Sequence, residues 1–194
     1  MNQLYMTFVD TAVAAVPMVP VFLWLKVRRY RDWKTTLWYL SFVLYLCGVY
    51  AVAGLPTAVY IRFQPRFNWI PFRYMFTAWE TTVLNVVLFL PLGFFLPLLW
   101  QRFASLLRVM VTGFALSMGV ELLQLFTFRA TDVNDLMTNT LGAALGFFCA
   151  RLLARLLPIS PPRRSARELT VLLGAVFLVM FFLHPLLTGL LGIP

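Results

Sequence analysis

Long apolar runs, interrupted by short polar segments, extend along the whole chain. Runs of about 20 apolar residues match the length that a helix needs to cross roughly 30 Å of hydrocarbon. The runs are continuous, whereas strands of a membrane barrel alternate apolar and polar positions. The pattern therefore predicts an all-α, polytopic membrane helix bundle with about six transmembrane helices. We place these spans at about residues 4–25, 36–61, 81–100, 105–126, 136–157 and 169–190.

Composition agrees with this class of protein. The chain is 61% hydrophobic and only 12% charged, whereas a water-soluble surface needs far more charge. A net charge of +9 could indicate nucleic-acid binding. The basic residues, however, lie in short connections between apolar runs, where they determine topology, so we expect no nucleic-acid partner. The first basic residue, Lys26, follows the first run, and we therefore expect no cleavable signal peptide.

The distribution of Lys and Arg predicts an orientation. Twelve of the 16 basic residues lie in the connections after the first, third and fifth spans, and four lie in the other connections. The positive-inside rule then places the three basic connections in the cytoplasm and both termini outside the cell membrane. We divide the chain into an N-terminal two-helix segment (1–64), a core (65–157), and a C-terminal cytoplasmic loop with the last transmembrane helix (158–194).

Prolines and aromatic residues mark unusual places in this bundle. Pro17 and Pro20 in the first span, and Pro91 in the third, are expected to bend or break their helices. Segment 62–80 is rich in aromatic residues and carries three arginines, so we expect it to lie in the outer membrane interface. Arg66 and Arg73 there could contact anionic head groups or phosphates. The alternative is an interfacial anchor that binds no ligand.

Polar residues concentrate between Ser117 and Gly146, at the junction of the fourth and fifth spans. Two sets of polar residues and glycines recur at helical spacing, and each set should occupy one helix face. They are Gly113, Ser117, Glu121 and Gln124 in the fourth span, and Asp132, Asp135, Asn139, Gly142 and Gly146 in the fifth. The opposite directions of the two spans bring their polar ends to the depth of Asn85 in the third span. Ionisable groups in a membrane cost roughly 2.5–3.5 kcal/mol each on insertion scales, which favours a functional interpretation.

Several kinds of chemistry fit this arrangement. Arg129 can neutralise part of the acidic charge, which would give a purely structural ion-pair network. Crowded carboxylates also suit proton exchange or the binding of a cationic or hydroxyl-rich head group. A divalent cation held by Glu121, Asp132 and Asp135 is a third alternative, but histidine is absent from this region, and we expect no metal or cofactor. The roles of Asp10 and of the single histidine, His184, stay open.

Several sequence blocks together resemble the signature blocks of the VanZ-like membrane proteins, in that family's order and spacing. They are Asn68-Trp-Ile-Pro71-Phe72, Asn85-x3-Phe89-x-Pro91-Leu-Gly93-Phe, Ser117-x3-Glu121-x2-Gln124 and Arg129-x2-Asp132-x2-Asp135-x3-Asn139-Thr-x-Gly142-x3-Gly146. The resemblance covers about residues 65–157, and Trp69 replaces an aliphatic residue usual in the family. It implies a bacterial cytoplasmic-membrane protein. The family's namesake is associated with low-level resistance to teicoplanin-type glycopeptides, and relatives are associated with lipoglycopeptides. The resemblance implies no particular reaction.

We therefore expect a multi-pass protein that binds an outer-leaflet envelope lipid or a lipid-linked cell-wall intermediate, and that is associated with reduced susceptibility to glycopeptide or lipoglycopeptide antibiotics. The expected ligand-binding residues are Asn68, Arg73, Asn85, Ser117, Glu121, Gln124, Arg129, Asp132, Asp135 and Asn139. The expected partners are membrane lipids, a lipid-linked cell-wall precursor or a glycopeptide antibiotic, and a second copy of the chain.

Two alternative functions remain. One is a membrane-embedded enzyme that acts on such a lipid with Glu121 or Asp135 as general acid or base. Familiar catalytic arrangements are absent from the sequence, so an enzyme is the less favoured interpretation. The other is a small lipid or ion transporter, in which proline-interrupted spans would line a pathway that a dimer completes.

Overall fold

The computed structural model describes residues 3–25, 32–73, 75, 77–127, 129–156 and 165–191 of the chain, with side chains from residue 9 onward. The chain forms two compact units. The terminal unit comprises Met1–Ile61 and Arg167–Pro194, and the central unit comprises Arg62–Ala166. The division into three segments made from the sequence stays a prediction.

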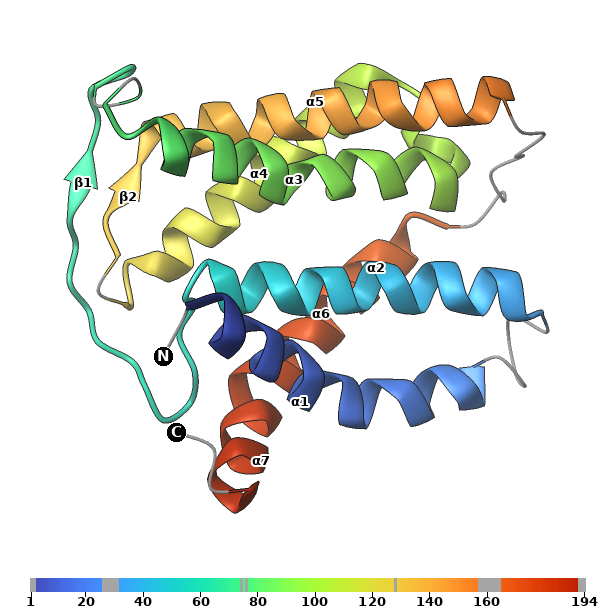
Figure 1. Cartoon of the computed structure of the whole chain (residues 1–194), viewed down its shortest axis with the longest axis horizontal. Helices are drawn as coiled ribbons and strands as arrows, with labels where there is room; N and C mark the ends of the chain where they lie inside the picture. Colours follow the sequence, from blue (N-terminus) through green and yellow to red (C-terminus); the bar gives the residue numbers. More distant parts are fainter. Residues whose placement is uncertain are drawn as a thin grey trace. The chain divides into compact units, whose positions relative to one another are not determined.

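The predicted all-α fold class is confirmed, because helices make up almost all of the secondary structure in the described ranges (Figure 1). Five helices there are long and apolar enough to cross a membrane. They are α2 (Trp33–Val52), α3 (Trp79–Leu99), α4 (Leu106–Gln124), α5 (Val133–Leu156) and the continuous helix Arg167–Leu191. Helix α1 (Gln3–Leu25) adds a shorter apolar stretch, Val9–Leu25.

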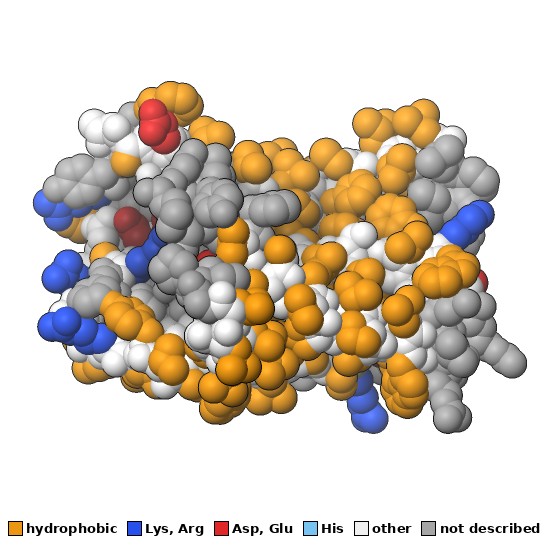
Figure 2. Space-filling view, turned by 60° about the horizontal axis from the view of Figure 1, so that its bottom comes forward, with side chains coloured by type: hydrophobic (Ala, Val, Ile, Leu, Met, Phe, Trp, Pro, Cys, Tyr) orange, Lys and Arg blue, Asp and Glu red, His pale blue; other side chains and the backbone are white. Residues whose placement is uncertain are grey.

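Large apolar side chains cover much of the outer surface of these helices. Figure 2 shows them gathered over the middle of one face, and Leu190 and Val59, for example, are 84% and 75% exposed. A water-soluble monomer rarely exposes apolar patches of this extent. The chain is therefore a membrane protein whose apolar surface suits contact with lipid. Six of the residues used for the orientation, Lys26, Arg28, Arg29, Arg31, Arg163 and Arg164, lie outside the described residues, and the orientation of the termini stays a prediction.

In the terminal unit, α1 packs on α2, and α2 packs on α6 (Arg167–Leu178). The predicted second span was too long at its C-terminus, because α2 ends at Val52. Gly54 adopts a positive φ of 59°. The N–H groups of Gly54 and Leu55 donate to the carbonyls of Ala51 and Tyr50, respectively. This is the Schellman arrangement that ends helices, and glycine adopts its left-handed conformation without steric cost.

The first and third spans are not broken at their prolines, whereas the alternative of a bend there stays a prediction. Helix α1 continues through Pro17 and Pro20, and α3 continues through Pro91. A proline removes one backbone donor, and a helix can continue when the rest of its hydrogen bonds and its packing remain.

A helical irregularity appears instead before Pro185. Residues Val179–Leu183 form a π-helical turn between α6 and α7 (His184–Leu191). Pro185 has no N–H to donate to the carbonyl of Phe181, four residues earlier, and the backbone N–H of Ala58 donates to that carbonyl at 2.8 Å.

In the central unit, α5 is the helix on which α3 and α4 pack (Figure 1). A short 3-10 turn, η2 (Gln101–Phe103), connects α3 to α4. Two short strands complete the unit, β1 (Phe67–Asn68) and β2 (Thr131–Asp132), which pair in parallel with Phe67 opposite Thr131 and Asn68 opposite Asp132. The pairing holds the segment that precedes α3 against the start of α5.

Candidate functional site

Buried polar side chains line the faces where α4 and α5 meet. The stripe predicted on the fourth span is buried along its whole length, from Gly113 through Ser117 and Glu121 to Gln124. On α5 the buried face includes Asn139, Gly142 and Gly146. We define the polar cluster as Asn68, Asn85, Ser117, Glu121, Gln124, Asp132, Asp135 and Asn139. Its members come from β1, β2, α3, α4 and α5.

Glu121 is the most deeply buried carboxylate of the cluster, with 2% of its surface exposed. Its Oε2 accepts a hydrogen bond from the backbone N–H of Asp132 at 2.9 Å. Its own carbonyl accepts from the Thr131 hydroxyl at 3.1 Å. Glu121 thus binds the β2 segment at two points, which satisfies backbone and side-chain groups that would otherwise be buried without partners.

Asp132 connects three elements. Its Oδ1 accepts from the backbone N–H of Asn134 at 2.8 Å, in the manner of an N-cap residue at the start of α5. Its Oδ2 accepts from the side-chain amide of Asn68 at 2.9 Å. The carboxylate therefore caps the N-terminus of α5 and also holds β1 beside β2.

Two more polar pairs follow along the same face of α5. The amide of Asn85 on α3 donates to Asp135 Oδ1 at 2.6 Å. The amide of Asn139 donates to the hydroxyl of Ser117 on α4 at 2.9 Å. Asp132, Asp135 and Asn139 thus contact β1, α3 and α4 in turn. One face at the start of α5 is bonded to the other main elements of the central unit.

Glycines bring the backbones of α3 and α5 into direct contact beside these pairs. A Cβ added to Gly142 would lie 2.2 Å from the carbonyl oxygen of Val86, and one on Gly146 would lie 1.9 Å from that of Leu90. On α3, a Cβ on Gly93 would lie 1.8 Å from the carbonyl oxygen of Ala143. Small residues permit such close approach between membrane helices. The approach brings Asn85 within reach of Asp135.

The carboxylates of the cluster lie close enough to influence one another. Glu121 interacts electrostatically with Asp132, Asp135 and Arg129, and Asp135 interacts with Asp132 and Arg129. Three carboxylates thus share the influence of the Arg129 guanidinium, whose side chain is exposed. A structural ion-pair network that includes Arg129 therefore stays an alternative to a ligand-binding site.

The remaining predicted site residues have different surroundings. Gln124 is buried at the end of α4, where its carbonyl accepts from the Thr127 hydroxyl at 3.0 Å. The side chain of Arg73 is exposed, and its carbonyl accepts from the Asn134 amide at 3.0 Å.

Asn134 is a buried residue beside the cluster that the sequence reasoning missed. Its Oδ1 accepts from the backbone N–H of Phe72 at 2.7 Å, while its amide donates to Arg73. Phe72 has a φ of 63°, which a bulky residue rarely adopts. It follows Pro71 in a turn that the Arg73 N–H closes on the Ile70 carbonyl, and this resembles a type II turn. The available signal was an Asn between two Asp residues at the start of a helix.

An exposed aromatic segment borders the cluster. Phe67 and Trp69 stack with ring centroids 5.3 Å apart and an interplanar angle of 18°, and Trp69 is 68% exposed. Phe63 packs against Phe126 beyond α4, with ring centroids 5.6 Å apart. The exposed Arg62 and Arg66 lie in the same segment. Aromatic and basic residues in this combination suit the interface between lipid head groups and hydrocarbon.

Among the described residues, no group of three or more His, Cys, Asp or Glu side chains could hold a metal ion. The carboxylates instead accept hydrogen bonds from amides and backbone N–H groups.

Comparison with known proteins gives one family match. A family model described as VanZ/LLP1 matches residues 42–155, more than half of the 194-residue chain. The resemblance stated from the sequence blocks is thereby confirmed, and the match begins further upstream, within α2. It includes every member of the polar cluster. No curated protein and no solved structure matches the chain.

Proposed function

The chain belongs to the VanZ/LLP1 family, and from this premise we propose that it binds an envelope lipid or a lipid-linked cell-wall intermediate at the polar cluster. The observation that carries the proposal is the hydrogen bonding of β2 and of one face of α5 to β1, α3 and α4, through Asp132, Asp135 and Asn139. This bonding fixes acidic and amide groups next to an exposed segment of aromatic and basic residues. Fixed groups bind a ligand without first losing their own conformational freedom.

The chemistry of the two surfaces favours a head group that carries both hydroxyl and phosphate groups. The half-buried carboxylates and amides of the cluster can accept from and donate to hydroxyl groups; they are Asn68, Asn85, Asp132 and Asp135. The guanidinium groups of Arg66 and Arg129, both exposed, can bind phosphate oxygens. The exposed rings of Phe67 and Trp69 can lie among the acyl or polyprenyl chains.

We place this site in the outer leaflet of a bacterial cytoplasmic membrane. The support is the distribution of basic residues, since only Arg62, Arg66, Arg73 and Arg129 belong to the connections on the side of the cluster. A protein in this position would meet cell-wall intermediates and the antibiotics that bind them. We therefore propose an association with reduced susceptibility to glycopeptides such as teicoplanin, or to lipoglycopeptides.

Conservative changes in two carboxylates test this function. Glu121→Gln and Asp135→Asn keep an oxygen that can accept the present hydrogen bonds but remove the charge. Both variants should abolish the reduction in susceptibility, measured as inhibitory concentration in a susceptible host, while their membrane levels match wild type. Glu80→Gln is the matched control, because Glu80 is an exposed carboxylate in the first turn of α3. Full protection by both cluster variants would reject the proposal.

The second candidate function is an enzyme that acts on the same lipid. Asp135 favours it, because its side chain is only half-buried and could reach a substrate, whereas Glu121 is buried and bound to the Asp132 backbone. Asp135 would then act as general acid or base. Incubation of purified protein with labelled envelope lipid separates the two candidates. Formation of a product supports catalysis, and saturable binding without product supports a binding protein.

A further inference from the structure

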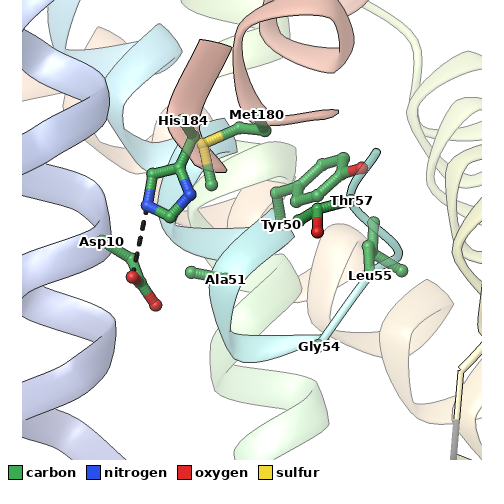
Figure 3. A pocket seen from close by; sticks show the side chains of 8 residues that line it. All are labelled: Asp10, Tyr50, Ala51, Gly54, Leu55, Thr57, Met180 and His184. Carbon is green, nitrogen blue, oxygen red and sulfur yellow. Dashed lines mark ion pairs between the residues drawn. The ribbon is translucent and has the colours of Figure 1, made fainter. Parts of the chain in front are cut away.

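A cavity in the terminal unit lies outside the polar cluster. Its volume is about 160 Å³, and it opens between the first helix, the end of α2 and the π-helical turn before α7 (Figure 3). It is lined by Asp10, Tyr50, Ala51, Gly54, Leu55, Thr57, Met180 and His184. We propose that this cavity binds a small organic ammonium group, either as a free amine or as the head group of a lipid.

The charge of the cavity comes from one carboxylate. Asp10 Oδ1 and His184 Nε2 are 3.2 Å apart, and their side chains are 29% and 11% exposed. The second carboxylate oxygen of Asp10 points away from the imidazole (Figure 3). Lys and Arg are absent from the described residues that line the cavity. The Asp10 carboxylate is thus the group among these residues that can pair with a cationic ligand.

An aromatic ring and a thioether form the walls near this charge. The Tyr50 hydroxyl donates to the Pro56 carbonyl, and the Tyr50 ring packs edge-on against Phe177, with centroids 6.4 Å apart. These contacts fix the ring, while Met180 is buried beside the cavity. The face of an aromatic ring attracts an ammonium group, and soft apolar walls accommodate its methyl or methylene groups. A carboxylate with an aromatic wall therefore suits an organic ammonium better than a hydrated metal ion.

Two irregular backbone segments shape the cavity, the turn at Gly54 and the π-helical turn before α7. Gly54, with its positive φ, ends α2 and turns the chain toward Thr57. The Ala58 N–H then reaches the Phe181 carbonyl within the π-helical turn. Such turns are frequent at functional sites, because they change the direction in which the following side chains point. His184 and Met180 both reach the cavity from this region.

The size of the cavity suits a small group. At about 30 Å³ per water molecule, it holds roughly five waters. That is enough for an ethanolamine- or choline-sized group. The residues that line the cavity all belong to the terminal unit, and none is a member of the polar cluster. The proposal therefore does not rest on the function proposed for that cluster.

Titration of the purified full-length protein in nanodiscs of phosphatidylglycerol tests the proposal. Tetramethylammonium and ethanolamine are the probes, and calorimetry is the readout. Wild type should bind at least one probe saturably, and Asp10→Asn should weaken this binding roughly tenfold. Asp32→Asn is the matched control, because it removes the same charge at the other end of α2 and leaves a residue that can still cap the helix. It should bind as wild type does.

A second variant tests the cavity without altering the Asp10–His184 pair. Ala51→Leu places a larger side chain among the lining residues and should also abolish binding. Nanodiscs that contain phosphatidylethanolamine distinguish the two sources of the ligand. Loss of probe binding there supports the lipid head group, and unchanged probe binding supports the free amine. Absence of saturable binding in wild type, or equal binding by wild type and a folded Ala51→Leu variant, would overturn the proposal.

Discussion

Two neighbouring side chains, Asp132 and Asn134, connect the start of α5 to the segment that precedes α3. Asp132 binds the Asn68 side chain, and Asn134 binds the backbone on both sides of the Phe72–Arg73 peptide. Phe72 has the positive φ that usually requires glycine. Side chains from a helix start therefore stabilise an irregular turn 61 and 62 residues earlier in the chain.

Asn134→Ala tests this connection. The substitution removes an acceptor and a donor from the turn at Phe72 and should lower the free energy of unfolding by about 1–3 kcal/mol. Thermal unfolding in detergent, monitored by tryptophan fluorescence, measures the effect. Equal stability of wild type and Asn134→Ala would show that the turn holds without this side chain.

Helical spacing alone could predict several contacts at the residue scale. The spacing placed Glu121, Gln124, Asp135 and Asn139 at the depth of Asn85, and a hydrogen bond joins Asn85 to Asp135. Spacing could not predict the hydrogen bonds of Asn134, because its partners are backbone groups of a turn in a distant segment. The conformation of Phe72 has no sequence signal except the preceding Pro71, which many turns share.

At the scale of elements, the contact between α3 and α5 is made by backbone against backbone. Gly93 faces the carbonyl of Ala143, while Gly142 and Gly146 face carbonyls of α3. Without side chains between them, the two helices approach closely enough for dispersion contacts along their length. The polar pair Asn85–Asp135 depends on this approach.

Gly146→Ala should disrupt that packing. Its Cβ would lie 1.9 Å from the Leu90 carbonyl oxygen and 2.8 Å from the Phe94 nitrogen, and both are backbone atoms that cannot move aside alone. We expect a loss of about 3 kcal/mol or more in unfolding free energy. Gly119→Ala on α4 is the matched control, because nothing lies within 4 Å of its added Cβ, and it should be neutral or stabilising. Similar melting temperatures for the two variants would contradict the packing described here.

The sequence could predict where the helices lie, but it could not predict where α2 ends or that β1 pairs with β2. Apolar runs fixed the approximate positions of the helices, because burial in lipid depends mainly on length and composition. Helix ends depend on local caps, and the Gly54 arrangement ended α2 nine residues before the predicted boundary at residue 61. The parallel pair of β1 and β2 has two residues in each strand. Strands that short carry no alternating pattern that could predict them.

At the scale of the whole molecule, the orientation in the membrane rests on the basic residues. The prediction is that both termini lie outside, with the connections after the first, third and fifth helices in the cytoplasm. An alkaline phosphatase fusion after Pro194, which is active only outside the cytoplasm, should therefore be active. A fusion in the connection between α5 and α6 should be inactive and serves as the control. The opposite pattern would move the polar cluster to the cytoplasmic side and reject its proposed ligands.

The chain thus carries two candidate sites of different chemistry, one in each compact unit. The polar cluster lies in the central unit, within the residues that match the VanZ/LLP1 family. The cavity at Asp10 and His184 lies in the terminal unit. Each site can be altered by substitutions that leave the residues of the other unchanged, so their functions can be tested separately.

Binding of a labelled polyprenyl-diphosphate-linked cell-wall intermediate to the purified protein tests the central claim most directly. Titrations in nanodiscs should give saturable binding to wild type and to Glu80→Gln. Asp135→Asn, which keeps an acceptor for Asn85 but lacks the charge, should bind roughly tenfold more weakly. Equal affinity of wild type and Asp135→Asn, or binding that never saturates, would contradict the assignment of the polar cluster as a lipid-binding site.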